Sequence, residues 1–266
     1  MRILSFDVGG SKIAWGIVDE NGKIISEVKI MKTPKMAEEI ADVFKKVVQE
    51  NKFNGFAVAT AGVVSNNKLA GKPNNLPNGY ENIDFAELSG TPYVIENDAN
   101  SAMWAEHKTG ALKGVQHGVM LTLGTDVGCG IICNGQILRG KCGAAGEVMF
   151  DCSGRSLQRL AAEAGSELTD CFAIYDLALR QNGAEREAYK IWQENLLDCL
   201  RRINQILDTE IFVLSGSLAK IVDYAAVNTS IKLLQPHNAP LIKPAVCGTN
   251  AGLIGAALLC VQKMKG

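Results

Sequence analysis

The sequence predicts an α/β fold in which strands alternate with helices along the chain. Short apolar runs such as Ile3–Asp7 end at glycine or polar turns, whereas longer stretches such as 36–51 carry apolar residues at helical spacing. A strand, a glycine turn, a second strand and an Asn-Gly hairpin also occur in this order twice, in LSFDVGGSKIAWGIVDENGKII and in LTLGTDVGCGIICNGQIL. We interpret these segments as two copies of one supersecondary unit, although a match this short does not by itself establish duplication.

The first half of the chain is expected to begin with three strands. They are Ile3–Asp7, Ile13–Val18 after Gly9-Gly10, and Lys23–Ile30 after the hairpin turn Asn21-Gly22. The elements expected next are helix Met36–Asn51, strand Phe53–Ala59, a loop over Val63–Ser89, strand Pro92–Glu96 and helix Ala99–Thr109. The loop is rich in Asn, Gly and Pro, and loops of this length inside compact domains are often functional.

The second half repeats the strand pattern and then becomes mostly helical. Its expected strands are Val119–Gly124, Gly130–Cys133, one that begins at Gln136–Leu138, and Ile211–Leu214. Helices are expected from Ser156 onward, and the longest covers Ala184–Leu207, where Trp192 lies on the apolar stripe and belongs to the core or a subunit interface. The last helix, Thr249–Lys263, is rich in small residues that permit close packing.

The composition excludes several classes of protein. With 27 Lys plus Arg against 28 Asp plus Glu, the net charge is −1, so the basic excess on which nucleic-acid binding depends is missing. No apolar stretch reaches the ~20 residues of a membrane span, and the run before Gly9-Gly10 is too short for a signal-peptide core. The eight cysteines form no CxxC pair. We therefore expect a cytoplasmic protein with reduced cysteines and with neither a membrane nor a nucleic-acid partner.

Three glycine turns follow apolar strands, at residues 7–12 (DVGGSK), 123–128 (LGTDVG) and 214–216 (LSG). Glycine lets the backbone approach a ligand and tolerates positive φ, so successive N–H groups can point at phosphate oxygens. The first two turns match neither the Walker pattern nor GxGxxG before a helix, and a plain tight turn is the alternative interpretation of each. Three turns together favour a nucleotide held between two lobes.

Two carboxylates stand next to turns. Asp98 follows an apolar strand and precedes a helix, so it is either a helix N-cap or a general base, and the sequence does not separate these roles. Glu147 ends the small-residue turn GAAGE, where it is either a solvated loop residue or a ligand-binding carboxylate.

Taken together, these motifs resemble the ROK family of sugar kinases and repressors, and the resemblance covers nearly the whole chain. In order, the matching segments are DVGGSK, AG…KPN, ENDAN, LTLGTDVGCGI, GAAGE, LSGSLA and AGLIGAALL. The resemblance implies the actin/hexokinase-like (ribonuclease H-like) fold with a duplicated βββαβα-type unit. One lobe would comprise residues 1–112 and 250–266, the other would comprise residues 113–249, and the active site would lie in the cleft between them.

The family's site roles carry over to matching residues. Asp98 would be the catalytic base that takes the proton from the attacking hydroxyl, while Asn74, Asn97 and Glu147 would bind the sugar. Phosphate contacts would come from the first turn and from the second, and adenosine contacts from the third. The residues implied are Asp7, Gly9, Gly10, Ser11 and Lys12 in the first turn, Gly124, Thr125 and Gly128 in the second, and Ser215 and Gly216 in the third. Mg²⁺ would accompany ATP near Asp7, and Ser11 keeps the hydroxyl of the family's usual Thr.

The chain departs from the family at its zinc motif. Members usually carry AGExGH and then CxCGxxGCxE, whose His and three Cys bind structural zinc. Here Glu147 is followed by Val148-Met149-Phe150, and only Cys152 of the cysteine pattern is present. Because tetrahedral zinc needs about four ligands, we expect no structural zinc. The missing His also contacts the sugar in the family, so its loss bears on which sugar is bound.

A second departure lies in the second phosphate turn, where Asp126 and Cys129 stand in place of the usual glycines. The extra carboxylate either repels ATP phosphates or helps to hold Mg²⁺, and the sequence does not decide between these effects. The chain is also somewhat shorter than typical members and begins without the helix-turn-helix of family repressors. We therefore expect no repression by direct DNA binding.

The resemblance implies an ATP- and Mg²⁺-dependent hexose kinase, with glucose phosphorylated at O6 as the default and a homodimer as the expected assembly. The sequence does not distinguish ATP from polyphosphate as the donor. The alternative is a catalytically degenerate sensor that binds a sugar or a nucleotide, which Asp126 and the lost zinc motif favour and which Asp98 and DVGGSK oppose. An α/β hydrolase is excluded because no GxSxG elbow occurs.

Overall fold

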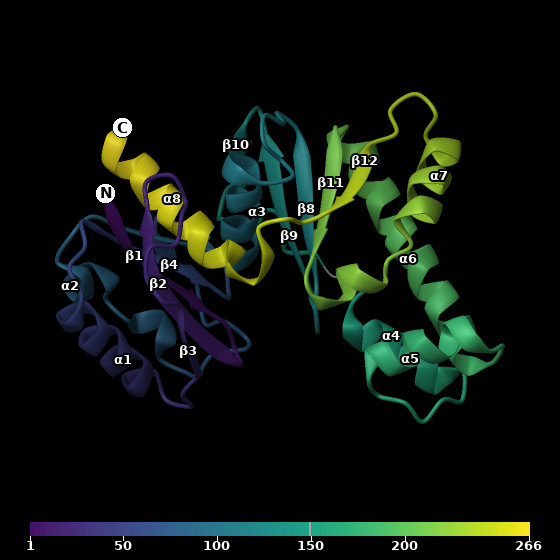
Figure 1. Ribbon diagram of the computed structural model, residues 1–266, viewed down its shortest axis with the longest axis horizontal. Coiled ribbons are helices and arrows are strands. Elements are labelled where there is room, and N and C mark those ends of the chain that lie inside the picture. Colours follow the sequence, from purple (N-terminus) through teal and green to yellow (C-terminus); the bar gives the residue numbers. More distant parts are fainter. Residues whose placement is uncertain (149) are drawn as a thin grey trace. The chain divides into compact units, whose positions relative to one another are not determined.

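The computed structural model describes residues 1–148 and 150–266, and it divides into two compact units (Figure 1). Unit 1 comprises residues 1–114, 137–145 and 246–266, and unit 2 comprises residues 115–136 and 146–245. The sequence assigns 113–249 to one lobe without interruption. The structure differs in segment 137–145, which packs with unit 1 because Arg139 and Gly143 contact residues there.

Unit 1 is built on a five-stranded sheet in the order β3-β2-β1-β4-β7. Its strands are Arg2–Val8 (β1), Lys12–Asp19 (β2), Lys29–Lys32 (β3), Gly55–Thr60 (β4) and Tyr93–Asn97 (β7). A separate hairpin joins Val64–Ser65 (β5) to Lys68–Leu69 (β6). The helices are Ala37–Glu50 (α1), Phe85–Ser89 (α2), Asp98–Thr109 (α3) and Ala251–Lys265 (α8), with 3₁₀ turns at Tyr80–Asn82 and Gly248–Asn250. β1 runs antiparallel to β2 and parallel to β4, which is parallel to β7.

The side chains on the two faces of β1 contact different parts of unit 1. Because side chains alternate along a strand, Leu4 and Phe6 join the apolar core on one face, where Phe6 packs edge-on against Phe44 of α1 at 4.6 Å between ring centroids. On the other face, Ser5 Oγ donates a hydrogen bond of 2.7 Å to the Leu253 carbonyl of α8. Asp7 shares the face of Ser5, so its carboxylate lies on the α8 side of the sheet.

The close packing predicted for the last helix is confirmed. A Cβ atom at Gly255 of α8 would lie only 1.6 Å from the Ser101 carbonyl oxygen of α3, so no larger residue fits there. Helices in contact at this distance need small residues at the crossing.

A buried carboxylate holds the places where the chain first leaves unit 1 and finally returns to it. Glu106 of α3 is fully buried, and its Oε2 accepts a hydrogen bond of 2.7 Å from Ala111 N. Its Oε1 accepts from Val246 N at 2.8 Å and from Cys247 N at 2.6 Å. Since the chain first leaves unit 1 after Gly114 and finally returns at Val246, one side chain holds both segments.

Two predicted elements of unit 1 differ in the structure. The third strand covers Lys29–Lys32 rather than 23–30, because Ser26 Oγ accepts the hydrogen bond of Ile17 N at 2.8 Å in place of a strand carbonyl. The predicted loop Val63–Ser89 contains α2 and the β5–β6 hairpin, whose tip residues Asn66 and Asn67 both have positive φ. Asn tolerates this backbone conformation better than most residues, so it can form such a turn.

Unit 2 repeats the sheet of unit 1. Its strands are Gly118–Leu123 (β8), Val127–Cys133 (β9), Gln136–Ile137 (β10), Ile211–Ser215 (β11) and Leu241–Pro244 (β12), and they lie in the order β10-β9-β8-β11-β12. Numbered within each unit, both sheets therefore have the order 3-2-1-4-5. This shared topology confirms the duplicated unit.

Helices cover the sheet of unit 2 and enclose its core. They are Gly154–Glu163 (α4), Cys171–Arg180 (α5), Ala184–Leu207 (α6) and Tyr224–Leu234 (α7), with a 3₁₀ turn at Ser217–Ile221. Trp192 of α6 is fully buried in the core cluster, and its indole N–H donates to the Ser153 carbonyl at 3.0 Å. Trp192 is therefore a core residue, one of the two roles predicted for it.

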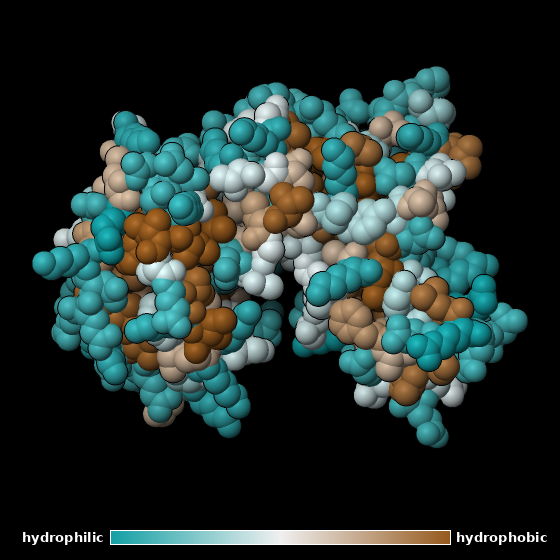
Figure 2. Space-filling model, viewed as in Figure 1, coloured by the Kyte–Doolittle hydropathy of each residue, from teal (hydrophilic) through white to brown (hydrophobic). Residues whose placement is uncertain are grey.

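The surface is mostly hydrophilic in the view of Figure 2, and hydrophobic residues emerge on unit 1 over β2 and β3. There Ile30 of the edge strand β3 is exposed, but Lys29 and Lys32 stand at the ends of that strand. Charged residues on an edge strand oppose pairing with another chain.

None of the helices in the described part of the chain combines the length and apolar character that crossing a membrane requires.

Candidate active site

The turn between β1 and β2 is a tight hairpin held by its own backbone. The Gly9 N–H donates to the Lys12 carbonyl at 3.0 Å, and Thr33 Oγ1 donates to the Gly9 carbonyl at 2.6 Å. The tip residues Gly10, Ser11 and Lys12 are exposed. The tip of the hairpin and the Lys12 residue thus lie on the surface of unit 1, as the predicted phosphate role requires.

The Asn-rich loop after β6 packs directly on this hairpin. A Cβ atom at Gly10 would lie 2.6 Å from the Asn75 carbonyl oxygen, so the two backbones touch there and only glycine fits. Asn74, the predicted sugar ligand, is exposed, and Pro73 before it is buried against Gly62. Unit 1 therefore brings Asn74 beside the first hairpin.

Asp7 lies at the carboxyl end of β1, where it faces the first turn of α8. A Cβ atom at Gly252 would lie 2.8 Å from Asp7 Oδ2, so glycine at this position makes room for the carboxylate. Burial, and to a smaller extent the negative charge of Asp98, raise the pKa of Asp7 to about 7, while Lys12 acts in the opposite direction. The two carboxylates are thus close enough to repel each other, and a bound cation would relieve that repulsion.

Asp98 is the first residue of α3 and follows β7 directly, at the edge where the parallel strands β1, β4 and β7 end. The N-cap of α3 is Asn97, whose Oδ1 accepts a hydrogen bond of 3.1 Å from Asn100 N. The alternative role of Asp98 as the N-cap is therefore wrong, because the preceding residue has that role. Asp98 is exposed, and its Oδ1 accepts from Ala99 N at 2.9 Å.

The amide of Asn97 is engaged within the protein at both ends. Besides the cap made by Oδ1, Nδ2 donates to the Gly62 carbonyl at 3.1 Å, and the residue is only 8% exposed. These contacts fix the orientation of the side chain. Because an amide nitrogen carries two hydrogens, it can also donate to a ligand, as the predicted sugar contact requires.

Glu96 and Arg139 form an ion pair next to these residues, and sequence reasoning assigned neither of them a role. Glu96 is 2% exposed, and its Oε2 accepts from Arg139 Nε at 2.8 Å and lies 2.6 Å from Nη2. The sequence did contain one indication of this pair. Glu96 stands near the end of an apolar strand, where it is expected to be buried, and buried carboxylates are almost always paired. The partner, 43 residues away, could not be identified from the sequence.

In unit 2, the turn between β8 and β9 is braced by the first turn of α4. The Gly154 N–H donates to the Gly124 carbonyl at 2.7 Å, and the Arg155 N–H donates to the Thr125 carbonyl at 3.3 Å. Thr125 is exposed, and Gly128 N–H donates to Thr122 Oγ1 at 3.1 Å as the chain enters β9. The shape of this second predicted phosphate turn is therefore fixed within unit 2.

The two residues that replace family glycines in this turn lie in different environments. Asp126 is exposed and forms an ion pair of 2.9 Å with Arg155 Nη1. Such a surface pair contributes little stability, but it offsets the negative charge that Asp126 adds near the turn. Cys129 is buried in the core of unit 2, and burial raises the pKa of its thiol to about 12. Cys129 is therefore a neutral core residue.

The third glycine turn lies next to the second one. Ser215 of β11 pairs with Thr122 of β8, and Gly216 has a φ of 86°. A Cβ atom at Gly216 would lie 2.3 Å from the Leu123 carbonyl oxygen, directly before Gly124, so only glycine fits. Unit 2 thus brings together five of the ten residues predicted to contact nucleotide: Gly124, Thr125, Gly128, Ser215 and Gly216.

Glu147 is exposed and follows a constrained glycine of unit 2. Gly146 has a φ of 94°, and a Cβ atom there would lie 2.2 Å from the Cys129 carbonyl oxygen. Glu147 and the nucleotide turns belong to unit 2, whereas the first hairpin, Asn74, Asn97 and Asp98 belong to unit 1. The cleft that would unite the two groups stays a prediction.

The remnant of the zinc motif lies in the core of unit 2. Cys152 is fully buried, and a hydrogen bond with it, together with burial, raises the pKa of the Cys199 thiol. Within residues 1–148 and 150–266, no group of three or more His, Cys, Asp or Glu side chains is arranged to hold a metal ion. Met149, in the segment that replaces the family's zinc-binding His, lies outside the described residues.

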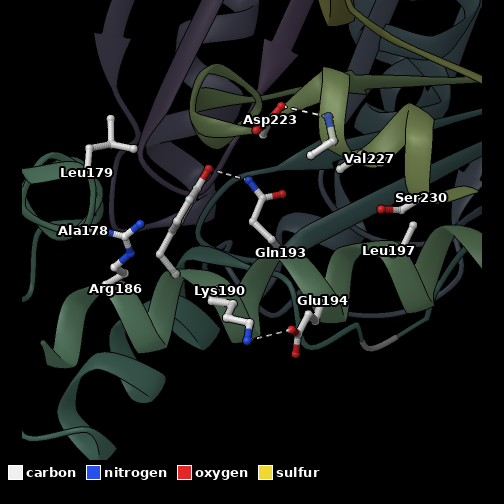
Figure 3. Close-up of a pocket in the computed structure, with 12 residues that line it drawn as sticks. Ala178, Leu179, Arg186, Lys190, Gln193, Glu194, Leu197, Asp223, Val227 and Ser230 are labelled. Carbon is white, nitrogen blue, oxygen red and sulfur yellow. Dashed lines mark hydrogen bonds and ion pairs between the residues drawn. The ribbon is translucent and has the colours of Figure 1, made fainter. Parts of the chain in front are cut away.

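Figure 3 shows a pocket of unit 2 that is lined by none of the predicted site residues. It has a volume of about 410 Å³, enough for a small molecule, and it is formed by α5, α6 and the start of α7. Its lining residues are Ala178, Leu179, Arg186, Tyr189, Lys190, Gln193, Glu194, Leu197, Asp223, Ala226, Val227 and Ser230. Since none of them was predicted to bind sugar or nucleotide, the pocket does not support either role.

Comparison with known proteins agrees with this architecture. The model of the ROK family matches residues 3–148, more than half of the chain. Over 156 residues, or 54% of this chain, the sequence is 36% identical to the glucokinase of Streptomyces coelicolor, but the match spans only 47% of that enzyme. Over 97% of this chain and 98% of the relative, it is 27% identical to the N-acetylmannosamine kinase of Salmonella typhi.

Among solved structures, the ROK hexokinase of Thermus thermophilus aligns with 100% of this chain and 99% of its own, with a TM-score of 0.84 and 25% identity. Agreement over the whole chain, together with the two sheets of identical order, confirms the predicted actin/hexokinase-like fold. The chain belongs to the ROK family.

Proposed function

We propose that this protein transfers the γ-phosphate of ATP to a hydroxyl group of a hexose, with Asp98 as the general base. The observation that carries the proposal is the register of the parallel strands: Asp7 of β1 pairs with Ala59 of β4, which pairs with Glu96 of β7, so Asp98 follows at the edge of the sheet where β1 ends. The proposed base therefore lies beside the hairpin proposed to bind phosphate. The similarity to a glucokinase and to an N-acetylmannosamine kinase supports a sugar as the acceptor.

The role of Asp98 follows from its position and from the chemistry of hydroxyl groups. A sugar hydroxyl is a poor nucleophile near neutral pH, and a carboxylate within hydrogen-bond reach accepts its proton during attack on the phosphorus. Asp98 is exposed at the carboxyl edge of the sheet, where a substrate can reach it. The bond from Ala99 N to its Oδ1 restricts the rotation of the carboxylate.

The acceptor in this proposal is glucose, phosphorylated at O6, with N-acetylmannosamine as the competing acceptor because of the second relative. Asn74 and Asn97 would donate to sugar hydroxyls from unit 1, and Glu147 would accept from them. Asn97 is already oriented by Asn100 N and the Gly62 carbonyl, so its contact would require little reorganisation.

The nucleotide would be held by the three glycine turns. Gly9, Gly10, Ser11 and Lys12 would bind phosphate from unit 1, and the turns of unit 2 would bind phosphate and adenosine. Mg²⁺ fits this arrangement, because it prefers carboxylate oxygens and would offset the repulsion between Asp7 and Asp98. When bound, Mg²⁺ would neutralise phosphate charge, and Asp7 would be the residue that faces it.

The structure weakens one of the arguments for the alternative function, a sensor without catalysis. That alternative was favoured by the extra carboxylate of Asp126 in the second phosphate turn, but the pairing with Arg155 offsets that charge. An ADP-release assay with ATP, Mg²⁺ and glucose, N-acetylmannosamine, mannose or fructose tests the proposal. We expect turnover with glucose. Binding of sugar and nucleotide by calorimetry, without turnover on any sugar, would instead identify a sensor.

A further inference from the structure

The carboxylate of Glu96 connects two parts of unit 1 that are distant in sequence. Its Oε1 accepts from Asn97 N at 3.0 Å and from Asn100 Nδ2 at 3.1 Å, so it is tied to the turn that carries Asp98. Its Oε2 accepts from Arg139, as described above. Glu96 is almost fully buried, whereas the Arg139 side chain is 45% exposed, so the guanidinium closes the carboxylate off from solvent.

Arg139 begins a closed segment, residues 139–145, that lies on unit 1. The Ala145 N–H donates to the Arg139 carbonyl at 3.1 Å, which fixes the two ends of the segment together. Between them, Gly143 has a φ of 80°, and a Cβ atom there would lie 1.9 Å from the Val64 carbonyl oxygen of β5. The segment is therefore seated on unit 1 at two points, the Glu96 carboxylate and the β5–β6 hairpin.

The same segment leads without a spacer into the proposed sugar ligand. Gly146 follows Ala145 and packs on the Cys129 carbonyl of unit 2, and Glu147 is the next residue. Residues 139–145 thus belong to unit 1, whereas Gly146 and Glu147 belong to unit 2.

We propose that Arg139 is a positioning residue of the sugar site: by pairing with Glu96 it fixes the carboxylate that holds the turn carrying Asn97 and Asp98. The inference rests on the proposed function, since it takes Asn97 as a sugar ligand and Asp98 as the base. Arg139 itself contacts neither sugar nor nucleotide in this proposal. Its loss acts on sugar binding, because a ligand group displaced by about 1 Å can lower activity by ~10²-fold.

The test is steady-state kinetics with ATP and glucose on Arg139→Gln, Arg139→Lys and Glu96→Gln. For Arg139→Gln we expect the KM for glucose to rise at least ~10-fold and the KM for ATP to stay within ~2-fold. Arg139→Lys keeps a cation and is expected to restore part of the glucose affinity. Combining Arg139→Gln with Glu96→Gln should add little to either single change, because both remove the same contact.

The matched control is Arg159→Gln. The Arg159 side chain is 47% exposed, a fraction similar to the 45% of Arg139. It pairs with Asp151 and Glu163 in unit 2. The Arg159→Gln variant should have the wild-type KM for glucose and the wild-type KM for ATP. The inference is overturned if Arg139→Gln has the wild-type KM for glucose, or if both KM values and the melting temperature change together without rescue by Lys. If Arg139→Gln does not fold, the Lys and Glu96 variants decide by the same criteria.

The two proposals can fail separately. If the wild-type protein phosphorylates no sugar, the proposed function fails, and calorimetric titration of glucose into wild type and Arg139→Gln decides the inference alone. A glucose Kd that rises at least ~10-fold in the variant supports the positioning role, and an unchanged Kd, or no glucose binding by the wild type, contradicts it.

Discussion

Replacing Asp7 by Asn should make the folded protein more stable at alkaline pH. Burial, and secondarily Asp98, raise the pKa of Asp7 to about 7 from an ordinary value of 3.8. The folded protein therefore holds the proton more tightly than the unfolded chain does. As pH rises from about 4 to about 7, the unfolded chain ionises first, and the folded state loses stability relative to it. Asn cannot ionise, so the variant escapes this loss.

The size of the effect follows from the displacement of the pKa. A pKa raised from 3.8 to about 7 corresponds to about 4 kcal/mol of unfolding free energy above pH 7. Asp7 is partly accessible to solvent, so we expect about half of that value, about 2 kcal/mol at pH 8. The gain should shrink as pH falls below 7 and disappear near pH 4.

Urea denaturation without Mg²⁺ or nucleotide, at several pH values between 4 and 8, measures this dependence. Asp42→Asn on α1 is the control, because Asp42 is 75% exposed and pairs with Lys45 at the surface. Its stability should track the wild type at every pH. A gain for Asp7→Asn that is the same at pH 4 and pH 8, or a loss of stability at pH 8, would refute the reasoning.

Two further predictions concern charged side chains outside the sugar site. Glu106→Ala leaves the N–H groups of Ala111, Val246 and Cys247 without their acceptor, and it should lower the unfolding free energy by about 3–5 kcal/mol in urea denaturation; a loss below about 1 kcal/mol would contradict this. Arg155→Gln removes the partner of Asp126 and should raise the KM for ATP several-fold, more strongly at low ionic strength, with the KM for glucose unchanged. If Arg155→Gln has the wild-type KM for ATP, the charge of Asp126 does not affect the binding of the ATP phosphates.

The sequence was sufficient to predict the features that depend on local pattern. Apolar runs that stop at glycines identified the strands β1, β4, β8 and β11, and the two similar segments indicated the duplicated unit, whose sheets have the same strand order. Asp98 could be assigned to a strand–helix junction for the same reason. The pattern did not distinguish Asp98 from Asn97 as the cap, since that choice depends on the rotamer of one side chain and both residue types cap helices well.

Features that depend on contacts distant in sequence were not predictable. The ion pair of Arg139 with Glu96 joins residues that no local periodicity relates, and it explains why segment 137–145 packs with unit 1. The place of Gly252 against Asp7 likewise appears only once α8 lies on β1. The β5–β6 hairpin was missed for a different reason, because its strands have two residues each and its turn is made by two Asn residues with positive φ.

The central claim is that Asp98 accepts a proton from the sugar, and Asp98→Asn tests it most directly. Because Asn97 caps α3, the change should leave the helix intact, and an amide of nearly the same shape should preserve glucose binding in calorimetry. An amide cannot accept the hydroxyl proton, so we expect kcat with ATP and glucose to fall at least ~100-fold. A variant that binds glucose normally and keeps more than about a tenth of the wild-type kcat would contradict the account.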